Sequence, residues 1–235
     1  MEQSIPFRKA KVFMRQLSGK EPRLKIDVKL PTENYSDWDV VPDLLEKDDI
    51  VYSFGICDDI GFELDAIQKK VNIFAFDPTP YSVDWIKTQK LPSNFKFYPW
   101  AASGTDGEFF LYPRVQKKGK KSTVMYTFHK EAGAGDDGVK VKALTLQTIA
   151  KELGHSKIDV LKMDIEGAEY EVVDSLLASS LRPKMVLIEF HHRFKGIGRN
   201  KTSKAVKDLR EAGYLIASVS ITNREVCFVY NSALA

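Results

Sequence analysis

The segment IVYSFGICDDIG, residues 50–61, decides how the rest of the chain is interpreted. It opens with a short apolar run that contains β-branched residues, Gly55 follows directly, and an amphipathic run begins at Ile60. This order predicts a buried strand, a tight turn and a helix. Backbone N–H groups are exposed where such a helix begins, and a glycine lets a ligand approach the main chain closely. We therefore expect a ligand at the turn formed by residues 54–58.

A second apolar run, VNIFAF at residues 71–76, ends in Asp77, which lies 22 residues after Gly55. An acidic residue at about this distance from a glycine turn accepts hydrogen bonds from the two hydroxyl groups of a ribose. Pro78 and Pro80 then require a loop, because each proline restricts the residue before it. The spacing predicts that Asp77 binds a ribose.

The phosphate-binding pattern GxGxxG is broken, because Cys57 and Ile60 occupy its second and third glycine positions. Asp58 and Asp59 add negative charge where a pyrophosphate would lie. The turn therefore favours a nucleoside ligand without phosphates, of which S-adenosylmethionine is the most common. Ala101 and Ala102 follow the third predicted strand, residues 95–98, and these small side chains leave room for the adenine ring.

Length and composition indicate one α/β core. The 235 residues are 43% hydrophobic, which is enough to bury the core of one full α/β domain. We assign residues 38–235 to this domain and residues 1–37 to an N-terminal helix and entry segment. A net charge of +3 is too small to argue for nucleic acid. Two distant cysteines and the lack of a spanning or signal-type apolar run favour a reduced, cytoplasmic protein without a disulfide.

The N-terminal stretch Ile5–Leu17 has the pattern of a basic amphipathic helix. Its apolar side carries Ala10, Phe13, Met14 and Leu17, and its other side carries Lys9, Lys11 and Arg15. Such stripes usually mark packing, so we expect this helix to cover one edge of the core. A helix that binds a membrane surface or a partner is the alternative.

Residues 103–143 form the least regular part of the chain, with a basic run at residues 117–121 and a glycine-rich stretch at residues 133–138. We expect a mobile loop that contains one short strand, residues 109–112. Long loops beside a cofactor site often cover the substrate, although basic runs are more often only solvated.

The run IDVLKMDI, residues 158–165, predicts the next strand and places Lys162 and Asp164 on one side by period-2 alternation. A lysine within a parallel sheet requires a carboxylate partner. The following strand, residues 184–190, places Glu189 and His191 on one face. The carboxyl ends of these strands bring Asp164, Glu189 and His191 together at the edge where open α/β sheets bind ligands.

Other interpretations of this cluster remain open. Glu189 would have only a structural role if it neutralised Lys162. Glu166 and Glu169 are expected in the first turn of a helix over residues 167–180, where carboxylates are favoured by the helix dipole. Capping and catalysis are therefore both compatible with Glu166.

Two final strands, residues 215–221 and 226–230, are joined by only four residues, 222–225. So short a connection excludes a parallel crossover and predicts an antiparallel hairpin. A nucleotide-binding sheet that ends in such a hairpin is typical of S-adenosylmethionine-dependent methyltransferases and unusual among dehydrogenases.

Four motifs make the chain similar to the FkbM family of S-adenosylmethionine-dependent methyltransferases. They are VYSFGICDDIGFE at residues 51–63, FAFDPTP at 74–80, IDVLKMDIEGAEYEV at 158–172 and LIEFHHRF at 187–194. The resemblance implies a Rossmann-like class I methyltransferase fold, a cofactor held by Gly55 and Asp77, and O-methylation of sugar or polyketide hydroxyls. The chain departs from many methyltransferases in having Ser53 at an often acidic position and Cys57 at a common glycine position.

The hypothesis is an O-methyltransferase that acts on a hydroxyl of a sugar or glycan-like small molecule. Either Asp164 or His191 is expected to accept the hydroxyl proton, with a divalent ion at the same cluster as the less favoured mechanism. A catalytically silent binding module and a nicotinamide-dependent sugar enzyme are the alternatives. The candidate catalytic residues are Asp164, His191, Glu189 and Lys162, and the candidate cofactor residues are Phe54, Gly55, Ile56, Cys57, Asp58, Asp77, Pro78, Ala101 and Asp164.

Overall fold

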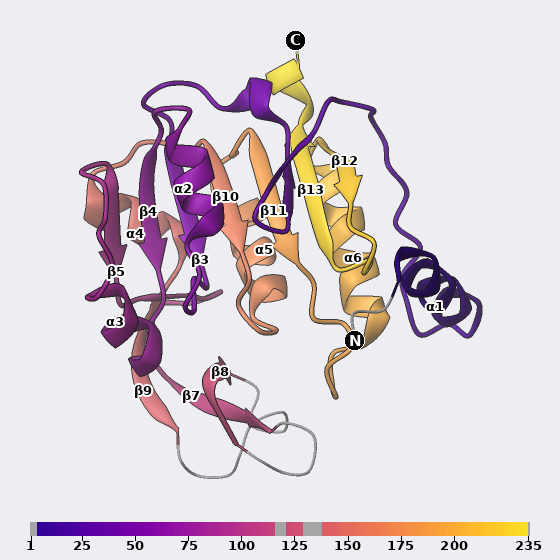
Figure 1. The fold of residues 1–235 in the computed structure, drawn as a ribbon, viewed down its shortest axis with the longest axis horizontal. Coiled ribbons are helices and arrows are strands. Elements are labelled where there is room, and N and C mark those ends of the chain that lie inside the picture. Colours follow the sequence, from indigo (N-terminus) through magenta and orange to yellow (C-terminus); the bar gives the residue numbers. More distant parts are fainter. Residues whose placement is uncertain (1–3, 116–120, 129–137, 235) are drawn as a thin grey trace.

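A twisted seven-stranded sheet forms the centre of the molecule (Figure 1). The computed structural model describes residues 4–115, 121–128 and 138–234. The strands lie in the order β12-β13-β11-β10-β3-β4-β5. Their bounds are β3 Ile50–Phe54, β4 Asn72–Phe76, β5 Phe95–Tyr98, β10 Val160–Met163, β11 Met185–Glu189, β12 Tyr214–Val219 and β13 Glu225–Tyr230.

The five strands from β11 to β5 are parallel, so their carboxyl ends share one edge. At the other side of the sheet, β13 pairs antiparallel with both β11 and β12. The predicted C-terminal hairpin is therefore confirmed, as is the mostly parallel α/β fold. The parallel pairing of β3 with β10 places Phe54 beside Met163, so the residues that follow each strand, Gly55 and Asp164, are neighbours.

Helices cover both faces of the sheet. The core on one face includes residues of α4 (Leu146–Leu153), α5 (Glu169–Ala178) and α6 (Gly198–Glu211). The core on the other face includes residues of α2 (Gly61–Ile67), α3 (Pro80–Ile86) and the small strand β2 (Trp38–Val40), which pairs with β1 (Glu33–Tyr35). Alternation along β10 sends Leu161 and Met163 into the first core and Val160 into the second, as the sequence pattern predicts.

A second sheet replaces most of the loop expected over residues 103–143. Its strands are β6 (Ala101–Ala102), β7 (Gly107–Val115), β8 (Lys121–Thr127) and β9 (Val139–Leu144), in the order β6-β9-β7-β8. The expectation of a loop with one short strand is therefore wrong. The strands of this sheet are stabilised by a small core of their own, which includes Leu111, Val141 and Ala143. This sheet lies beyond the edge where the parallel strands end (Figure 1). Most of the basic run and nearly all of the glycine-rich stretch, at residues 116–120 and 129–137, lie outside the described residues.

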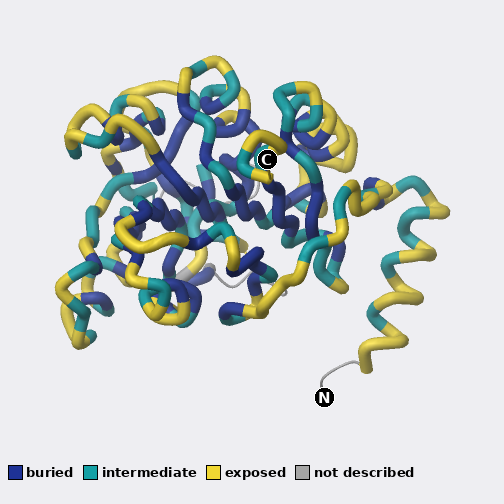
Figure 2. The backbone as a smooth tube through the Cα atoms, turned by 90° about the horizontal axis from the view of Figure 1, so that it is seen from above, coloured by how far each residue is buried: buried dark blue, intermediate teal, exposed yellow. Residues whose placement is uncertain are grey.

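The N-terminal helix α1 has the predicted bounds, Ile5–Leu17, but not the predicted packing. None of its residues is buried, and the helix projects from the body of the molecule (Figure 2). The expectation that it covers an edge of the core is therefore wrong. No helix in the described ranges is long and apolar enough to cross a membrane.

Candidate active site

The turn after β3 is built around Gly55, which has a φ of +77°. A Cβ at this position would lie 1.7 Å from the carbonyl oxygen of Asp164, so only glycine fits between the ends of β3 and β10. The Gly55 N–H donates to the Phe76 carbonyl at 2.9 Å, and the Asp164 N–H donates to the Phe54 carbonyl at 3.0 Å. The turn therefore joins the ends of three strands at one point.

Cys57 occupies a strained position in the same turn. Its φ of +48° is a left-handed conformation that favours glycine. Burial raises the pKa of the Cys57 thiol to about 12, and the neighbouring Asp58 carboxylate adds to the effect. The side chain is therefore a neutral thiol at the wall of the cavity described below.

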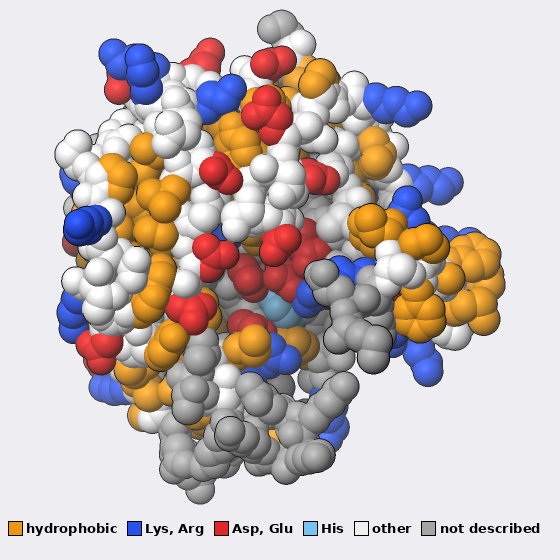
Figure 3. All heavy atoms as spheres, viewed as in Figure 1, with side chains coloured by type: hydrophobic (Ala, Val, Ile, Leu, Met, Phe, Trp, Pro, Cys, Tyr) orange, Lys and Arg blue, Asp and Glu red, His pale blue; other side chains and the backbone are white. Residues whose placement is uncertain are grey.

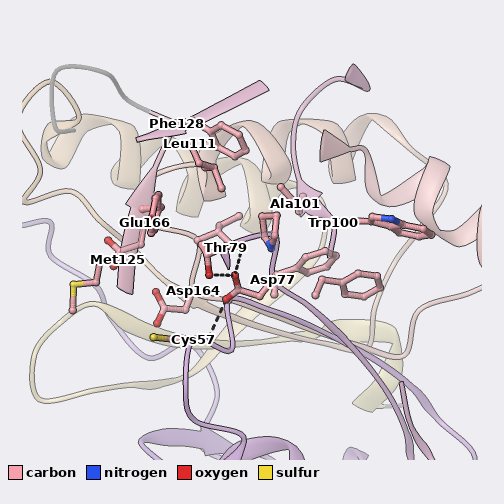
Figure 4. Close-up of a pocket in the computed structure, with 17 residues that line it drawn as sticks. Cys57, Asp77, Thr79, Trp100, Ala101, Leu111, Met125, Phe128, Asp164 and Glu166 are labelled. Carbon is pink, nitrogen blue, oxygen red and sulfur yellow. Dashed lines mark hydrogen bonds between the residues drawn. The ribbon is translucent and has the colours of Figure 1, made fainter. Parts of the chain in front are cut away.

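Asp77 holds the turn from the end of β4 and is itself 5% exposed. One carboxylate oxygen accepts from the Cys57 N–H at 3.0 Å, and the other accepts from the N–H and the hydroxyl of Thr79 at 2.9 and 2.7 Å (Figure 4). A carboxylate offers about four lone-pair positions. One ribose hydroxyl is therefore accommodated directly, whereas a second must displace one of the three protein donors.

A narrow cavity of 90 Å³ lies between this turn and the second sheet. Phe76, Pro78, Trp100 and Ala101 supply its flat or small apolar walls at the strand ends. Leu111 and other residues of the second sheet line its far side (Figure 4). The remaining acceptor position of Asp77 and the apolar walls fit the nucleoside part of S-adenosylmethionine, since a carboxylate can accept a hydrogen bond from a ribose hydroxyl and flat apolar walls suit adenine. Of the expected cofactor residues, Phe54, Gly55, Cys57, Asp77, Pro78, Ala101 and Asp164 line this cavity.

Ile56 and Asp58 do not line the narrow cavity. Ile56 is 2% exposed and packs in the core that contains α2. Asp58 accepts a hydrogen bond from the Tyr81 hydroxyl at 3.0 Å on the surface. Ile56 instead lines a larger neighbouring cavity.

Lys162 is 5% exposed, and its partner is not the one considered from the sequence. Its ammonium donates to the Gly55 carbonyl at 3.1 Å and lies 3.8 Å from the Glu63 carboxylate of α2. Glu63 also accepts a hydrogen bond from the Ser53 hydroxyl. The predicted need for a carboxylate is thus met by Glu63, and the suggestion that Glu189 neutralises Lys162 is wrong.

His191 lies among four carboxylates just after β11 and is 3% exposed. Its Nδ1 lies 3.3 Å from Glu169, and its Nε2 lies 3.4 Å from Glu166, 3.7 Å from Asp164 and 3.8 Å from Glu189. Burial favours the neutral imidazole, but the buried Glu169 carboxylate and its neighbours outweigh it and raise the pKa of His191 to about 9. At neutral pH the side chain is therefore an imidazolium.

Two arginines that the sequence did not single out complete this cluster. Arg224 of the loop before β13 forms an ion pair with Glu189, and Arg114 of β7 donates to Glu166 at 2.7 Å. Burial and the charge of Asp164 nevertheless raise the pKa of Glu189 to about 8. Burial also raises the pKa of Glu166, against the opposing charges of His191 and Arg114.

Glu166 does not lie in the first turn of a helix, as was expected, because α5 begins only at Glu169. It instead adopts a φ of +51° in the preceding turn, and Gly167 follows with a φ of +107°. The Thr127 hydroxyl of β8 donates a hydrogen bond to the Glu166 carbonyl at 2.8 Å. This strained backbone directs the Glu166 carboxylate toward Arg114 and His191.

A second, larger cavity of 590 Å³ adjoins the first and shares Gly55, Cys57 and Asp164 with it. Acidic side chains gather around a hollow on this face of the molecule (Figure 3). The cavity is lined by seven acidic residues, Asp37, Asp39, Asp59, Glu63, Asp164, Glu189 and Glu225, and by three basic residues, Arg8, Lys162 and Arg224. Trp38, Phe62, Asn34 and several hydroxyl side chains complete its wall.

Glu21 organises a further buried cluster next to the active site. Its carboxylate is fully buried and accepts from Arg15 at 2.7 Å, from Arg193 at 2.6 Å and from the imidazole of His192. Burial opposes ionisation, but the hydrogen bonds from His192, Arg193 and Arg15 lower the pKa of Glu21 to about 2. The N-terminal segment thus supplies the partner of His192, whose imidazole contacts Glu21 and not the carboxylates around His191.

Comparison with known proteins places this architecture in a family. The sequence-family model described as the methyltransferase FkbM domain matches residues 41–216 of this chain. The hexuronic acid methyltransferase AglP of Haloferax volcanii is 23% identical over 187 residues, which cover 78% of this chain and 70% of the relative. The probable methyltransferase-like protein 24 of Rattus norvegicus is 25% identical over 149 residues, which cover 62% of this chain and 34% of that protein.

Among solved structures, the FkbM methyltransferase of Methylobacillus flagellatus superposes with a TM-score of 0.51 at 12% identity. The match covers 87% of this chain and 48% of that chain, so the present chain spans about half the length of this relative. At this identity the match shows the fold alone. The family model, by contrast, covers most of the chain, and the chain therefore belongs to the FkbM family of S-adenosylmethionine-dependent methyltransferases.

Proposed function

We propose that this chain transfers the methyl group of S-adenosylmethionine to a hydroxyl group of a sugar that carries no carboxylate. The observation that carries the proposal is the position of Asp164, which lines both the narrow cavity and the large cavity. Its side chain is 35% exposed, so a group in either cavity has access to its carboxylate. A methyl donor and an acceptor held in the two cavities would meet at this residue.

Asp164 is proposed as the base that accepts the hydroxyl proton. An alcohol is a poor nucleophile at neutral pH, so removal of its proton and positioning of the reactants assist the reaction. When bound, S-adenosylmethionine supplies an electrophilic methyl group. His191 is already protonated at neutral pH and is nearly inaccessible, which favours a role in holding the carboxylates of the cluster.

Lys162 is proposed to position the turn instead of contacting the reactants. Its hydrogen bond to the Gly55 carbonyl and its charge opposite Glu63 fix the main chain beside the cofactor cavity. The ligand atoms of Asp164, Glu166 and His191 lie within 4.8 Å of one another, so a divalent ion is the second candidate for activating the acceptor. Binding such an ion requires a neutral His191 and competes with Arg114 for Glu166.

The large cavity supports a sugar acceptor by its chemistry. Carboxylates, hydroxyls and an amide can form hydrogen bonds with sugar hydroxyls, and the buried Trp38 and Phe62 add apolar wall to the cavity. The name of the Haloferax volcanii relative includes a sugar, hexuronic acid. In the present chain, the seven acidic residues that line the cavity outnumber its three basic ones, and Asp37, Asp39 and Asp59 have no ion pair to any described residue, so the excess of negative charge disfavours an anionic sugar.

Replacing Asp77 with alanine should weaken S-adenosylmethionine binding by about 1.5–3 kcal/mol, roughly a factor of ten to one hundred, because a hydrogen bond to a charged group is lost. Isothermal titration calorimetry measures the change. Thr79→Val is the matched control, since it removes only the hydroxyl that Asp77 accepts from and leaves the carboxylate in place. An affinity of Asp77→Ala within twofold of the parent protein would remove Asp77 from the cofactor site.

The acceptor proposal is tested with three pyranosides that differ in one substituent: a neutral glucoside, the amino sugar and the uronide. Saturation-transfer NMR in the presence of S-adenosylhomocysteine should show binding of the first two that is at least about tenfold tighter than binding of the uronide. Methyl transfer to the first two, followed with labelled S-adenosylmethionine, should have the same preference. The double variant Asp37→Asn/Asp59→Asn should reduce the difference in affinity between the uronide and the other two sugars.

Preferential binding or methylation of the uronide would contradict the proposed charge selectivity. Binding in the expected order without any methyl transfer would instead support a catalytically silent module, the alternative that the strained Cys57 turn leaves open. The Asp77 experiment is independent of the acceptor and tests the cofactor site in both cases.

A further inference from the structure

The apolar side of α1 faces solvent. Ile5, Phe7, Phe13, Met14 and Leu17 are each between 55% and 62% exposed. At 3.6 residues per turn, four of these side chains, all except Ile5, lie with Ala10 within an arc of about 120°. None of the residues of α1 is buried, and the helix projects from the body of the molecule (Figure 2), so this apolar arc is exposed in the described part of the chain.

The polar side of the same helix is turned toward the body of the protein. Arg15 donates to the buried Glu21 carboxylate at 2.7 Å, and the Gln16 amide donates to the Pro22 carbonyl at 3.2 Å. These contacts orient the helix so that its apolar arc is directed outward. An ordinary surface helix has the opposite orientation, with its apolar side toward the core.

The charges around the apolar arc are all positive. Between Ser4 and Lys20 the sequence contains no acidic residue and five basic ones, Arg8, Lys9, Lys11, Arg15 and Lys20, of which Arg15 is paired with Glu21 and Arg8 lines the large cavity. Lys9 and Lys11 are exposed and lie on the two flanks of the arc. Figure 3 shows the resulting patch, in which hydrophobic side chains at the edge of the molecule are bordered by basic ones.

This combination selects among possible partners. A second copy of α1 would bring like charges together, which is unfavourable. A 13-residue helix is too short to span a bilayer, but it is long enough to lie in the interface between lipid headgroups and acyl chains. Basic residues beside an apolar arc match a bilayer that contains anionic phospholipids, since its headgroups are negatively charged and its acyl chains are apolar.

We propose that α1 binds the surface of an anionic phospholipid bilayer, with Phe7, Phe13, Met14 and Leu17 inserted and Lys9 and Lys11 at the headgroups. The helix is held to the catalytic domain by Glu21, whose other partners are His192 and Arg193. The bilayer surface is therefore in a defined position relative to the loop that carries His191. The enzyme would work on the membrane surface without a spanning segment in α1.

The test is flotation of the purified chain with vesicles of phosphatidylcholine alone or mixed with phosphatidylglycerol. We expect binding to the mixed vesicles that is at least about tenfold stronger, and that weakens when salt is raised from about 0.1 to about 0.5 M. The triple variant Phe13→Ser/Met14→Ser/Leu17→Ser and the double variant Lys9→Gln/Lys11→Gln should each lose at least about tenfold in binding.

Lys47→Gln/Lys87→Gln is the control, because it removes the same charge from exposed lysines outside α1 and should bind as the parent does. Since α1 has no buried residue, all variants should retain the parent circular dichroism spectrum and thermal transition. Equal binding to both vesicle types, or full binding by the triple variant, would overturn the proposal. So would a dimer in sedimentation velocity without lipid that the triple variant abolishes, because α1 would then be a protein interface.

Discussion

Replacing Asp164 with asparagine is expected to lower kcat by about 10²–10⁴-fold, the usual contribution of a positioned base. Asparagine has nearly the same shape, so the contact between the Asp164 N–H and the Phe54 carbonyl should remain and cofactor affinity should change little. The loss should appear in the rate of methyl transfer to an accepted sugar, measured with labelled S-adenosylmethionine. Asp65→Asn is the matched control and should keep the parent rate, since Asp65 is exposed on α2 and lines neither cavity.

The same assay distinguishes the two proposed ways of activating the acceptor. A metal-free base predicts that a chelator leaves the parent activity unchanged. Activity that disappears with chelator and returns with magnesium or manganese would assign Asp164 and its neighbours to an ion instead. Full activity of Asp164→Asn would exclude both roles for this residue.

Replacing Glu169 with alanine is expected to reduce the free energy of unfolding by about 3–5 kcal/mol, because one partner of a buried charge pair is removed. Glu169 is fully buried and accepts from the His191 N–H at 2.7 Å and the Gly167 N–H at 2.9 Å, in addition to its contact with the His191 ring. Urea denaturation measures the change. Glu171→Ala, on the exposed side of the same helix, should stay within about 0.5 kcal/mol of the parent.

The destabilisation should depend on pH with a defined sign. The pKa of His191 is raised from 6.5 to about 9 in the folded protein, so this group contributes stability that is fully present below pH 6.5 and is lost as the pH rises through about 9. The difference between parent and Glu169→Ala should therefore be largest below pH 6.5 and smaller above pH 9. A difference that is constant across this range would mean that His191 is neutral beside Glu169.

The sequence predicted the main sheet well because its signals are local. The apolar strands, the glycine turn and the four-residue hairpin connection each depend on a few adjacent residues. The meeting of Asp164, Glu189 and His191 followed from the shared edge of parallel strands. The need of Lys162 for a carboxylate was predicted, but the residue suggested for it, Glu189, was wrong, because the actual partner Glu63 comes from the helix layer and its approach depends on packing between layers.

Other features have no local signal. Arg114 and Arg224 are isolated basic residues in the sequence, and only the folded chain brings them to Glu166 and Glu189. The second sheet was missed because its three longer strands are separated by polar and glycine-rich segments that resemble a loop. For α1, periodicity showed that an apolar side exists, but the direction of that side depends on Arg15 and its distant partner Glu21.

The burial of Glu21 has a consequence for the stability of shortened chains. A chain trimmed to start at Trp38 would retain all seven strands of the main sheet but would leave Arg193 and His192 without their carboxylate. Losing one partner of such a buried arrangement destabilises proteins by several kcal/mol, a large part of the total for a domain. A chain that begins before Glu21 is therefore expected to be more stable than one that begins at Trp38, although both contain every strand of the main sheet.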